Sequence, residues 1–207
     1  MVSFVYFDVG GVLVKDFSGN DKWIKLLHDL GVQEKDYEKM VNFYDKHNDE
    51  FCSGRDVDTF IPEIAEKFGL KIPAEYSLNQ DFVDRFEVNK DIWPIVTFLK
   101  EKCRIGLLTN MYPGMLQLIE NRKLLPKVEW DVTIDSSIEK VCKPYKEIYE
   151  IAERESGVDK KEILFIENTQ KNVKAAEDFG WQTYFYDSSR YVESAKNLEL
   201  FIKDLFK

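Results

Sequence analysis

Histidine and cysteine are scarce in this 207-residue chain, which has two of the former and three of the latter. Neither His28 nor His47 has a metal-ligand partner at useful spacing; His28 is expected to be solvated and His47 to pack in an apolar stripe. Cys52, Cys103 and Cys142 show neither the spacing of a metal knuckle nor the even count of a disulfide framework. The sequence therefore argues against a zinc site or disulfide scaffold and favours a reducing compartment.

Long apolar runs are also missing. No stretch approaches the roughly 20 apolar residues that span a bilayer. The first eight residues, MVSFVYFD, have no basic segment before their apolar run and no small-residue cleavage pattern. We therefore expect a cytoplasmic protein that does not insert into a membrane.

Positive charge is outweighed by negative charge, with 29 Lys and Arg against 38 Asp and Glu and a formal net charge of -9. Such a surface repels a phosphate backbone or an anionic membrane, so neither nucleic acid nor membrane is an expected partner. A small anionic substrate would need a locally positive pocket. The sequence makes no prediction of oligomeric state.

Short apolar runs alternate with helical patterns in most of the chain, which predicts one α/β fold with a Rossmann-like parallel sheet between two helical layers. The predicted strands are Ser3 to Phe7, Ile105 to Leu108, Val132 to Ile134, Ile163 to Ile166 and Thr183 to Tyr186. The predicted helices of the outer layers are Ile92 to Lys100, Gly114 to Arg122, Tyr145 to Glu155, Asn172 to Phe179 and Tyr191 to Phe206.

A stretch of helical periodicity without a convincing strand separates the first two predicted strands. Its apolar stripes start at Trp23, Tyr37 and Phe60, and the first and third end at glycines. We interpret residues 15–90 as an inserted helical cap subdomain, and residues 1–14 and 91–207 as the core.

Polar residues follow the predicted strands at their carboxyl ends, where open parallel sheets bind ligands. Asp8 follows the first strand, and Gly10 and Gly11 come directly after it, so that the backbone can turn and a ligand can approach closely. The remaining candidates are Thr109, Asn110, Lys143, Glu167 and Asn168. Carboxylate, hydroxyl, ammonium and carboxamide groups are thus expected to converge.

These positions resemble the four motifs of the haloacid dehalogenase superfamily, in its capped phosphatase-like branch. The motifs are FDVGGVL, LLTN, CKP and FIENTQKNVKAAEDFGW, and the similarity covers nearly the whole chain.

The resemblance implies a hydrolase, most simply a phosphatase for a small phosphorylated molecule. Asp8 would attack phosphorus to form an aspartyl-phosphate, with Thr109 and Lys143 as the other catalytic residues. Gly10, Gly11 and Asn110 would bind phosphate. A Mg²⁺ cofactor would be held by Asp8, the carbonyl of Gly10, Glu167 and Asn168.

Two departures from the family pattern bear on activity. Most family phosphatases carry a second aspartate, a general acid and base, where this chain has Gly10. Loss of such a group commonly lowers rates by roughly 10² to 10⁴, and it would matter most for alkyl phosphates and less for acyl or anomeric phosphates. Glu167-Asn168 replaces the usual aspartate pair, which should lower metal affinity.

Two alternatives remain open. A catalytically impaired descendant would bind a phosphate ligand without turnover. A 2-haloacid dehalogenase would use the same aspartate to attack carbon without a metal, although Glu167 argues against it. Asn168 and Glu167 would also suit the polar start of a helix in a protein without catalysis.

Overall fold

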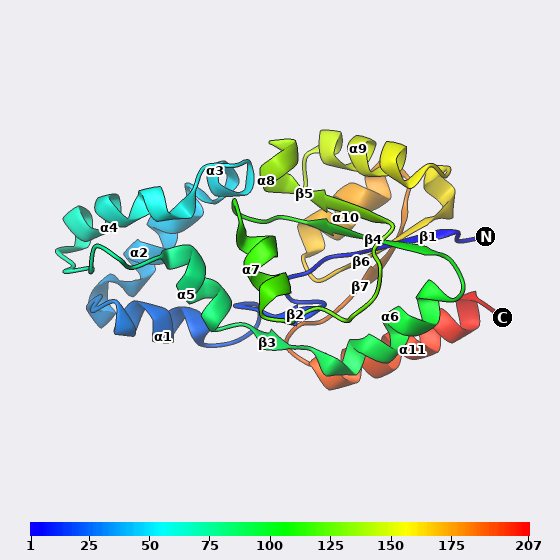
Figure 1. The fold of residues 1–207 in the computed structure, drawn as a ribbon, viewed down its shortest axis with the longest axis horizontal. Helices are drawn as coiled ribbons and strands as arrows, with labels where there is room; N and C mark the ends of the chain where they lie inside the picture. The colour runs from blue at the N-terminus through cyan, green and yellow to red at the C-terminus, as the bar shows by residue number, and fades with distance from the viewer.

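The computed structural model describes residues 1–207, and its centre is a five-stranded parallel sheet (Figure 1). The strand order is β5-β4-β1-β6-β7, so β1 is central. The strands are β1 (Phe4–Phe7), β4 (Arg104–Thr109), β5 (Val132–Asp135), β6 (Ile163–Glu167) and β7 (Gln182–Phe185). The predicted α/β fold with a parallel sheet is confirmed, with strand ends displaced by at most one residue.

Helices cover both faces of the sheet because successive strand residues point to opposite faces. Phe4 and Tyr6 pack with α9 and α10, whereas Val5 and Phe7 share a core with α6, α7 and α11. In Figure 1, α9 lies above the strands, and α6 and α11 lie below them. The helices are α6 (Trp93–Lys100), α7 (Met115–Asn121), α8 (Ser136–Glu139), α9 (Lys146–Ser156), α10 (Gln170–Phe179) and α11 (Tyr191–Leu205).

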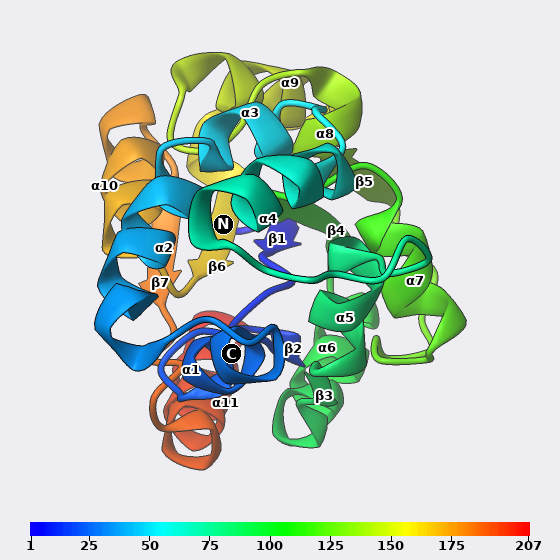
Figure 2. The same cartoon turned by 90° about the vertical axis from the view of Figure 1, so that its left-hand side faces the viewer.

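Five further helices form one group beyond the carboxyl ends of the strands, as Figures 1 and 2 show from two directions. They are α1 (Lys22–Asp29), α2 (Tyr37–Asp45), α3 (Asn48–Cys52), α4 (Ile61–Phe68) and α5 (Leu78–Asp84). Short 3₁₀ turns occupy η1 (Glu34–Asp36), η2 (Val57–Phe60), η3 (Lys90–Ile92) and η4 (Lys160–Glu162). We call α1 to α5, with their connecting segments, the helical insert.

Two details of the insert differ from expectation. A two-stranded antiparallel ribbon of β2 (Val14–Lys15) and β3 (Glu87–Val88) joins the insert to the sheet, where no strand was predicted. Strands of two residues are too short to show an alternating pattern. The stripe that starts at Tyr37 is also divided between α2 and α3, because the chain turns at Lys46 and His47.

Aromatic rings fill the interior of the insert. Trp23, Tyr44 and Phe82 pack edge to face on one another, and Phe43 and Phe51 meet Phe60. Buried insert side chains belong to the same hydrophobic cluster as those of α6, α7 and α11, so insert and sheet share one continuous core.

The histidines lie as expected. The side chain of His28 is 80% exposed, whereas the ring of His47 lies against Phe43 and Phe60. All three cysteines are free thiols. None of the helices has the length and apolar character that crossing a bilayer would require.

Candidate active site

The candidate site forms where β1, β4 and β6 end side by side. β1 pairs with β4 on one edge and with β6 on the other, so the chain connections run in opposite directions on the two sides of β1. Asp8 follows β1 directly, Thr109 closes β4 and Glu167 closes β6. An open parallel sheet binds ligands at such a switch point.

The ammonium group of Lys143 is fixed completely at this point. It lies 2.9 Å from Asp8 Oδ1 and 2.7 Å from Glu167 Oε2, and donates to the Leu108 carbonyl at 3.0 Å. All three of its N–H donors therefore have an acceptor. Lys143 is 1% exposed, so the cation cannot turn away into solvent.

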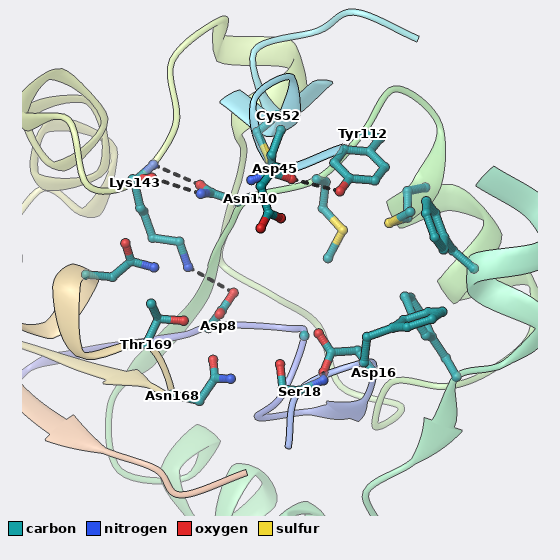
Figure 3. A pocket seen from close by; sticks show the side chains of 18 of the residues that line it. Asp8, Asp16, Ser18, Asp45, Cys52, Asn110, Tyr112, Lys143, Asn168 and Thr169 are labelled. Atoms are coloured by element: carbon teal, nitrogen blue, oxygen red, sulfur yellow. Dashed lines mark hydrogen bonds and ion pairs between the residues drawn. The ribbon is translucent and has the colours of Figure 1, made fainter. Parts of the chain in front are cut away.

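One carboxylate oxygen of Asp8 is held by other groups of the protein, and the other is free. Oδ1 accepts from the backbone N–H of Val9 at 2.8 Å and pairs with Lys143, while Oδ2 has no partner within the protein. The residue is 7% exposed and lines a cavity (Figure 3). A carboxylate anchored through one oxygen presents the other to a ligand.

Glu167 faces inward. Its two oxygens accept from four donors, which are Lys143, the amide of Asn172, and the backbone N–H groups of Asn168 and Thr169. Glu167 is fully buried and does not line the cavity. Its carboxylate is thus placed to position Lys143.

Two carboxylates therefore share one ammonium in a buried cluster. Burial, and then the negative charge of Glu167, raise the pKa of Asp8, although Lys143 opposes the shift. The same two carboxylates raise the pKa of Lys143 against the effect of burial. With all three groups charged the cluster carries one excess negative charge, which an added cation would balance.

Thr109 and Asn110 have different surroundings. Thr109 is 1% exposed, its hydroxyl has no hydrogen-bond partner, and it does not line the cavity. The side chain of Asn110 does line the cavity, and it also accepts from the Lys143 backbone N–H at 2.8 Å and donates to the Lys143 carbonyl at 2.9 Å. Asn110 thus holds the backbone that carries the ammonium.

Gly10 and Gly11, which follow Asp8, are required for different structural reasons. Gly11 has a φ of 77°, and a Cβ there would lie 2.1 Å from the amide nitrogen of Asn168, so both backbone and space require glycine. Gly10 has no left-handed φ; a Cβ there would instead lie 2.6 Å from Asp16 Oδ2. At position 10 the obstacle to a side chain is another carboxylate.

Asn168 lies between the two loops. In the amide orientation that satisfies its neighbours, its nitrogen is 3.2 Å from the Gly10 carbonyl oxygen and 3.0 Å from Glu167 Oε1, and its oxygen accepts from Ser18 Oγ at 3.2 Å. It thus links the segment after β1 to the segment after β6.

The cavity has a volume of about 360 Å³ and is closed on its far side by the helical insert. Its floor carries Asp8, Asn110, Lys143 and Asn168, which the sequence predicted as site residues. Much of the wall is aromatic, and sequence reasoning assigned none of its five rings from residues 15–90 to a cavity; these are Phe17, Trp23, Tyr44, Phe82 and Phe86, which Tyr112 joins. The apolar periodicity of the predicted helices indicated that some of these rings are core residues. Periodicity does not distinguish a ring inside a core from a ring at the edge of a cavity.

A magnesium ion is compatible with part of the predicted ligand set. Asp8 Oδ2 is free, the Gly10 carbonyl lies nearby, and a half-turn of the Asn168 amide would bring its oxygen to the same carbonyl. These are the hard oxygen donors that Mg²⁺ prefers, completed by water and substrate oxygens. Glu167 does not fit as a direct ligand, because its oxygens are already saturated. No group of three or more His, Cys, Asp or Glu side chains gathers at any one point of the chain to hold a metal, so the ligand set here would depend on carbonyl and amide oxygens beside Asp8.

A family model described as haloacid dehalogenase-like hydrolase matches residues 3–180. The chain therefore belongs to the haloacid dehalogenase-like hydrolases, as its four motifs predicted. A comparison with curated proteins found no significant match.

Solved structures of this superfamily are similar over nearly the whole chain. A haloacid dehalogenase family enzyme from Bacteroides thetaiotaomicron, an aspartate-to-alanine mutant in complex with magnesium and inorganic phosphate, is 21% identical, with a TM-score of 0.73 and coverage of 91% of this chain and 95% of the other. A predicted haloacid dehalogenase-like hydrolase from Porphyromonas gingivalis is 25% identical, with a TM-score of 0.73 and coverage of 96% and 98%. The L-2-haloacid dehalogenase of Xanthobacter autotrophicus, with chloropropionic acid covalently bound, is 20% identical, with a TM-score of 0.65 and coverage of 100% and 89%.

Proposed function

We propose that this hydrolase is a Mg²⁺-dependent phosphatase that transfers the phosphoryl group of a small phosphorylated molecule to Asp8. One observation carries the proposal. At the switch point of the sheet, a carboxylate with one free oxygen lies 2.9 Å from a fully fixed ammonium on the floor of a cavity that the insert partly covers. This pairs a nucleophile with a cation that offsets the charge of an incoming phosphate.

The roles of the other residues follow from their contacts. Glu167 and Asn110 hold Lys143 from its side chain and its backbone, and Thr109 offers an unpartnered hydroxyl at the end of the adjacent strand. Asp8, the Gly10 carbonyl and the Asn168 amide oxygen would hold Mg²⁺. When bound, the ion would supply positive charge against the phosphoryl oxygens.

The magnesium and phosphate complex of the B. thetaiotaomicron enzyme supports this reading for a protein of the same fold. We further propose that residues 15–90 act as a cap on a core of residues 1–14 and 91–207, because the insert closes the cavity. The substrate is then selected by the aromatic wall that the insert contributes.

The decisive experiment is phosphate release from a panel of phosphomonoesters, acyl phosphates and sugar 1-phosphates, with and without Mg²⁺. Wild type is compared with Asp8→Asn, which keeps the shape of the side chain but lacks the nucleophilic carboxylate. We expect turnover that needs Mg²⁺ and falls at least about 10³-fold in Asp8→Asn. Rapid quenching followed by mass spectrometry should find phosphate on Asp8.

Two other results would redirect the assignment. Phosphate binding without turnover above the Asp8→Asn background would identify a phosphate-ligand binder. Metal-independent halide release from a 2-haloacid, lost in Asp8→Asn, would identify a dehalogenase, the activity named for the X. autotrophicus structure.

A further inference from the structure

The second carboxylate of the site comes from Asp16, outside the segment that follows Asp8. Its Oδ2 lies 2.6 Å from the point that a Cβ of residue 10 would occupy, so this carboxylate fills the space into which a side chain at position 10 would project. Asp16 lines the cavity, and Figure 3 shows its carboxylate turned toward Asp8. Because the backbone at Gly10 has no left-handed φ, room for Asp16 is the visible reason for glycine there.

The turn that carries Asp16 fixes its orientation. Asp16 Oδ1 accepts from the backbone N–H of Ser18 at 2.8 Å, and Oδ2 takes part in no ion pair. Asp16 follows β2, which the ribbon with β3 holds at the foot of the insert. The carboxylate is therefore anchored through one oxygen and open through the other.

We propose that Asp16 is the acid–base catalyst of this hydrolase and replaces the side chain that Gly10 lacks. The inference rests on the phosphatase function proposed above. It also explains how a chain without a carboxylate at position 10 would process esters of poorly leaving alcohols.

The proton transfers balance over two steps. First, an Asp8 oxygen bonds to phosphorus while the bond from phosphorus to the ester oxygen breaks; that oxygen leaves with the bonding pair and takes the proton of the Asp16 carboxyl. Second, the Asp16 carboxylate takes a proton from water as the water oxygen bonds to phosphorus. The phosphorus–oxygen bond to Asp8 then breaks, which releases phosphate and restores both side chains.

The surroundings of Asp16 suit such a role. Burial raises the pKa of Asp16, opposed mainly by its hydrogen bonds from Ser18 and by the charge of Lys22 on α1. Lys22 is itself paired with Glu87 on β3. Burial raises the pKa values of the phenols of Tyr112, beside α7, and Tyr191, on α11, and the charge of Asp16 adds to both shifts.

The test compares wild type and Asp16→Asn across phosphate esters of increasing leaving-group basicity, with acetyl phosphate as the limit that needs no protonation. Asparagine keeps the acceptor for Ser18 and removes only the proton. The readout is kcat/KM, which reports the first step, so loss of the base in the second step does not mask it. We expect alkyl phosphates to lose about 10² to 10⁴-fold and acetyl phosphate to change less than about fivefold.

Three further variants make the result specific. Asp21→Asn removes an exposed carboxylate paired with Lys25, outside the cavity, and should match wild type. Gly10→Asp alone should lose activity because its side chain meets Asp16. The double variant Gly10→Asp with Asp16→Ala should regain alkyl phosphate turnover that Asp16→Asn lacks.

The proposal and the phosphatase function fail in different ways. No Asp8-dependent turnover of any phosphate by wild type would defeat the proposed function itself. A second outcome concerns Asp16 alone. If wild type turns over phosphates but Asp16→Asn loses equal activity on alkyl phosphates and on acetyl phosphate, and the double variant does not recover, Asp16 has only a structural role. A leaving-group effect that appears in Asp45→Asn instead would assign the proton to the other unpaired carboxylate of the cavity.

Discussion

The end of the sheet and the helical insert contribute opposite kinds of surface to one cavity. The end of the sheet supplies an ion cluster whose geometry is fixed by hydrogen bonds, with Lys143 satisfied on all three protons. The insert supplies aromatic rings, among them Trp23, Tyr44 and Phe82, which pack through shape and area. The buried ion cluster thus lies on the sheet side of the cavity, and most of the aromatic surface lies on the insert side.

This division has a physical reason. Buried charges tolerate little movement, because an ion separated from its partner in an apolar interior loses several kcal/mol. Strand ends in a five-stranded sheet are held on both sides and cannot drift. Aromatic contacts lose less when shifted, so a surface that meets a ligand through shape and area can be built from helices joined by loops.

Removal of the cation that Asp8 and Glu167 share should have the largest effect on stability and turnover. In Lys143→Met the carboxylates of Asp8 and Glu167 stay buried without their cation. We expect a loss of roughly 3 to 5 kcal/mol in unfolding free energy and of at least about 10²-fold in turnover. Chemical denaturation and phosphate release measure the two effects.

Matched variants identify the cause. Lys174→Met on α10 removes an exposed lysine paired with Asp178 and should change stability by less than about 0.5 kcal/mol. Addition of Glu167→Gln to Lys143→Met should recover part of the lost stability, because one of the unpaired carboxylates is gone. A stable Lys143→Met without that second change would contradict the ion cluster described here.

A change among the aromatic rings of the insert should alter substrate selection and leave the chemistry at Asp8 intact. Trp23 lines the cavity between Phe17 and Tyr44, so Trp23→Ala removes contact area from the leaving-group side. We expect kcat/KM to fall about tenfold for phosphates with large apolar leaving groups, equivalent to about 1.4 kcal/mol, and less than about threefold for acetyl phosphate.

The neighbouring residue Ile24 provides the control. Its side chain is largely exposed on α1 and does not line the cavity, so Ile24→Ala should leave both substrates unaffected. Equal losses for large and small substrates in Trp23→Ala would show that the insert supports the ion cluster and does not select the substrate.

The same division explains what the sequence predicted and what it did not. Apolar strands that end in polar residues are a local pattern, so the sheet and the positions of Asp8, Thr109, Lys143 and Glu167 were readable from the chain. Glu167 was assigned to the metal because neighbours in sequence do not reveal that Asn172 and Lys143 saturate it. Side-chain direction at a strand end depends on contacts distant in sequence.

The role of Asp16 was invisible for a related reason. Residues 14 and 15 show no strand pattern, and backbone hydrogen bonds within the turn after Asp8, from the N–H groups of Gly11 and Asp16 to the Val14 carbonyl, bring Asp16 to Gly10. The missing carboxylate at position 10 was evident from the sequence, but the conformation of this turn was needed to show which side chain fills its place.

The Mg²⁺ ligands proposed at the end of the sheet can be tested at Asn168. Asn168→Asp places a carboxylate oxygen where the amide nitrogen now lies 3.2 Å from the Gly10 carbonyl oxygen and 3.0 Å from Glu167 Oε1. Without metal, the new charge repels Glu167 and loses the amide's hydrogen bonds, so the variant should be less stable than wild type. With Mg²⁺ the new carboxylate becomes a ligand, and we expect Mg²⁺ affinity to rise about tenfold in calorimetry, with a correspondingly larger increase in Tm on metal addition.

Asn48→Asp adds the same charge on the insert side of the cavity, where Asn48 accepts a hydrogen bond from Tyr112, and controls for a general increase in negative potential. Equal gains in both variants would mean that Mg²⁺ responds to the charge of the whole cavity, whereas a gain confined to Asn168→Asp would assign residue 168 to the metal site.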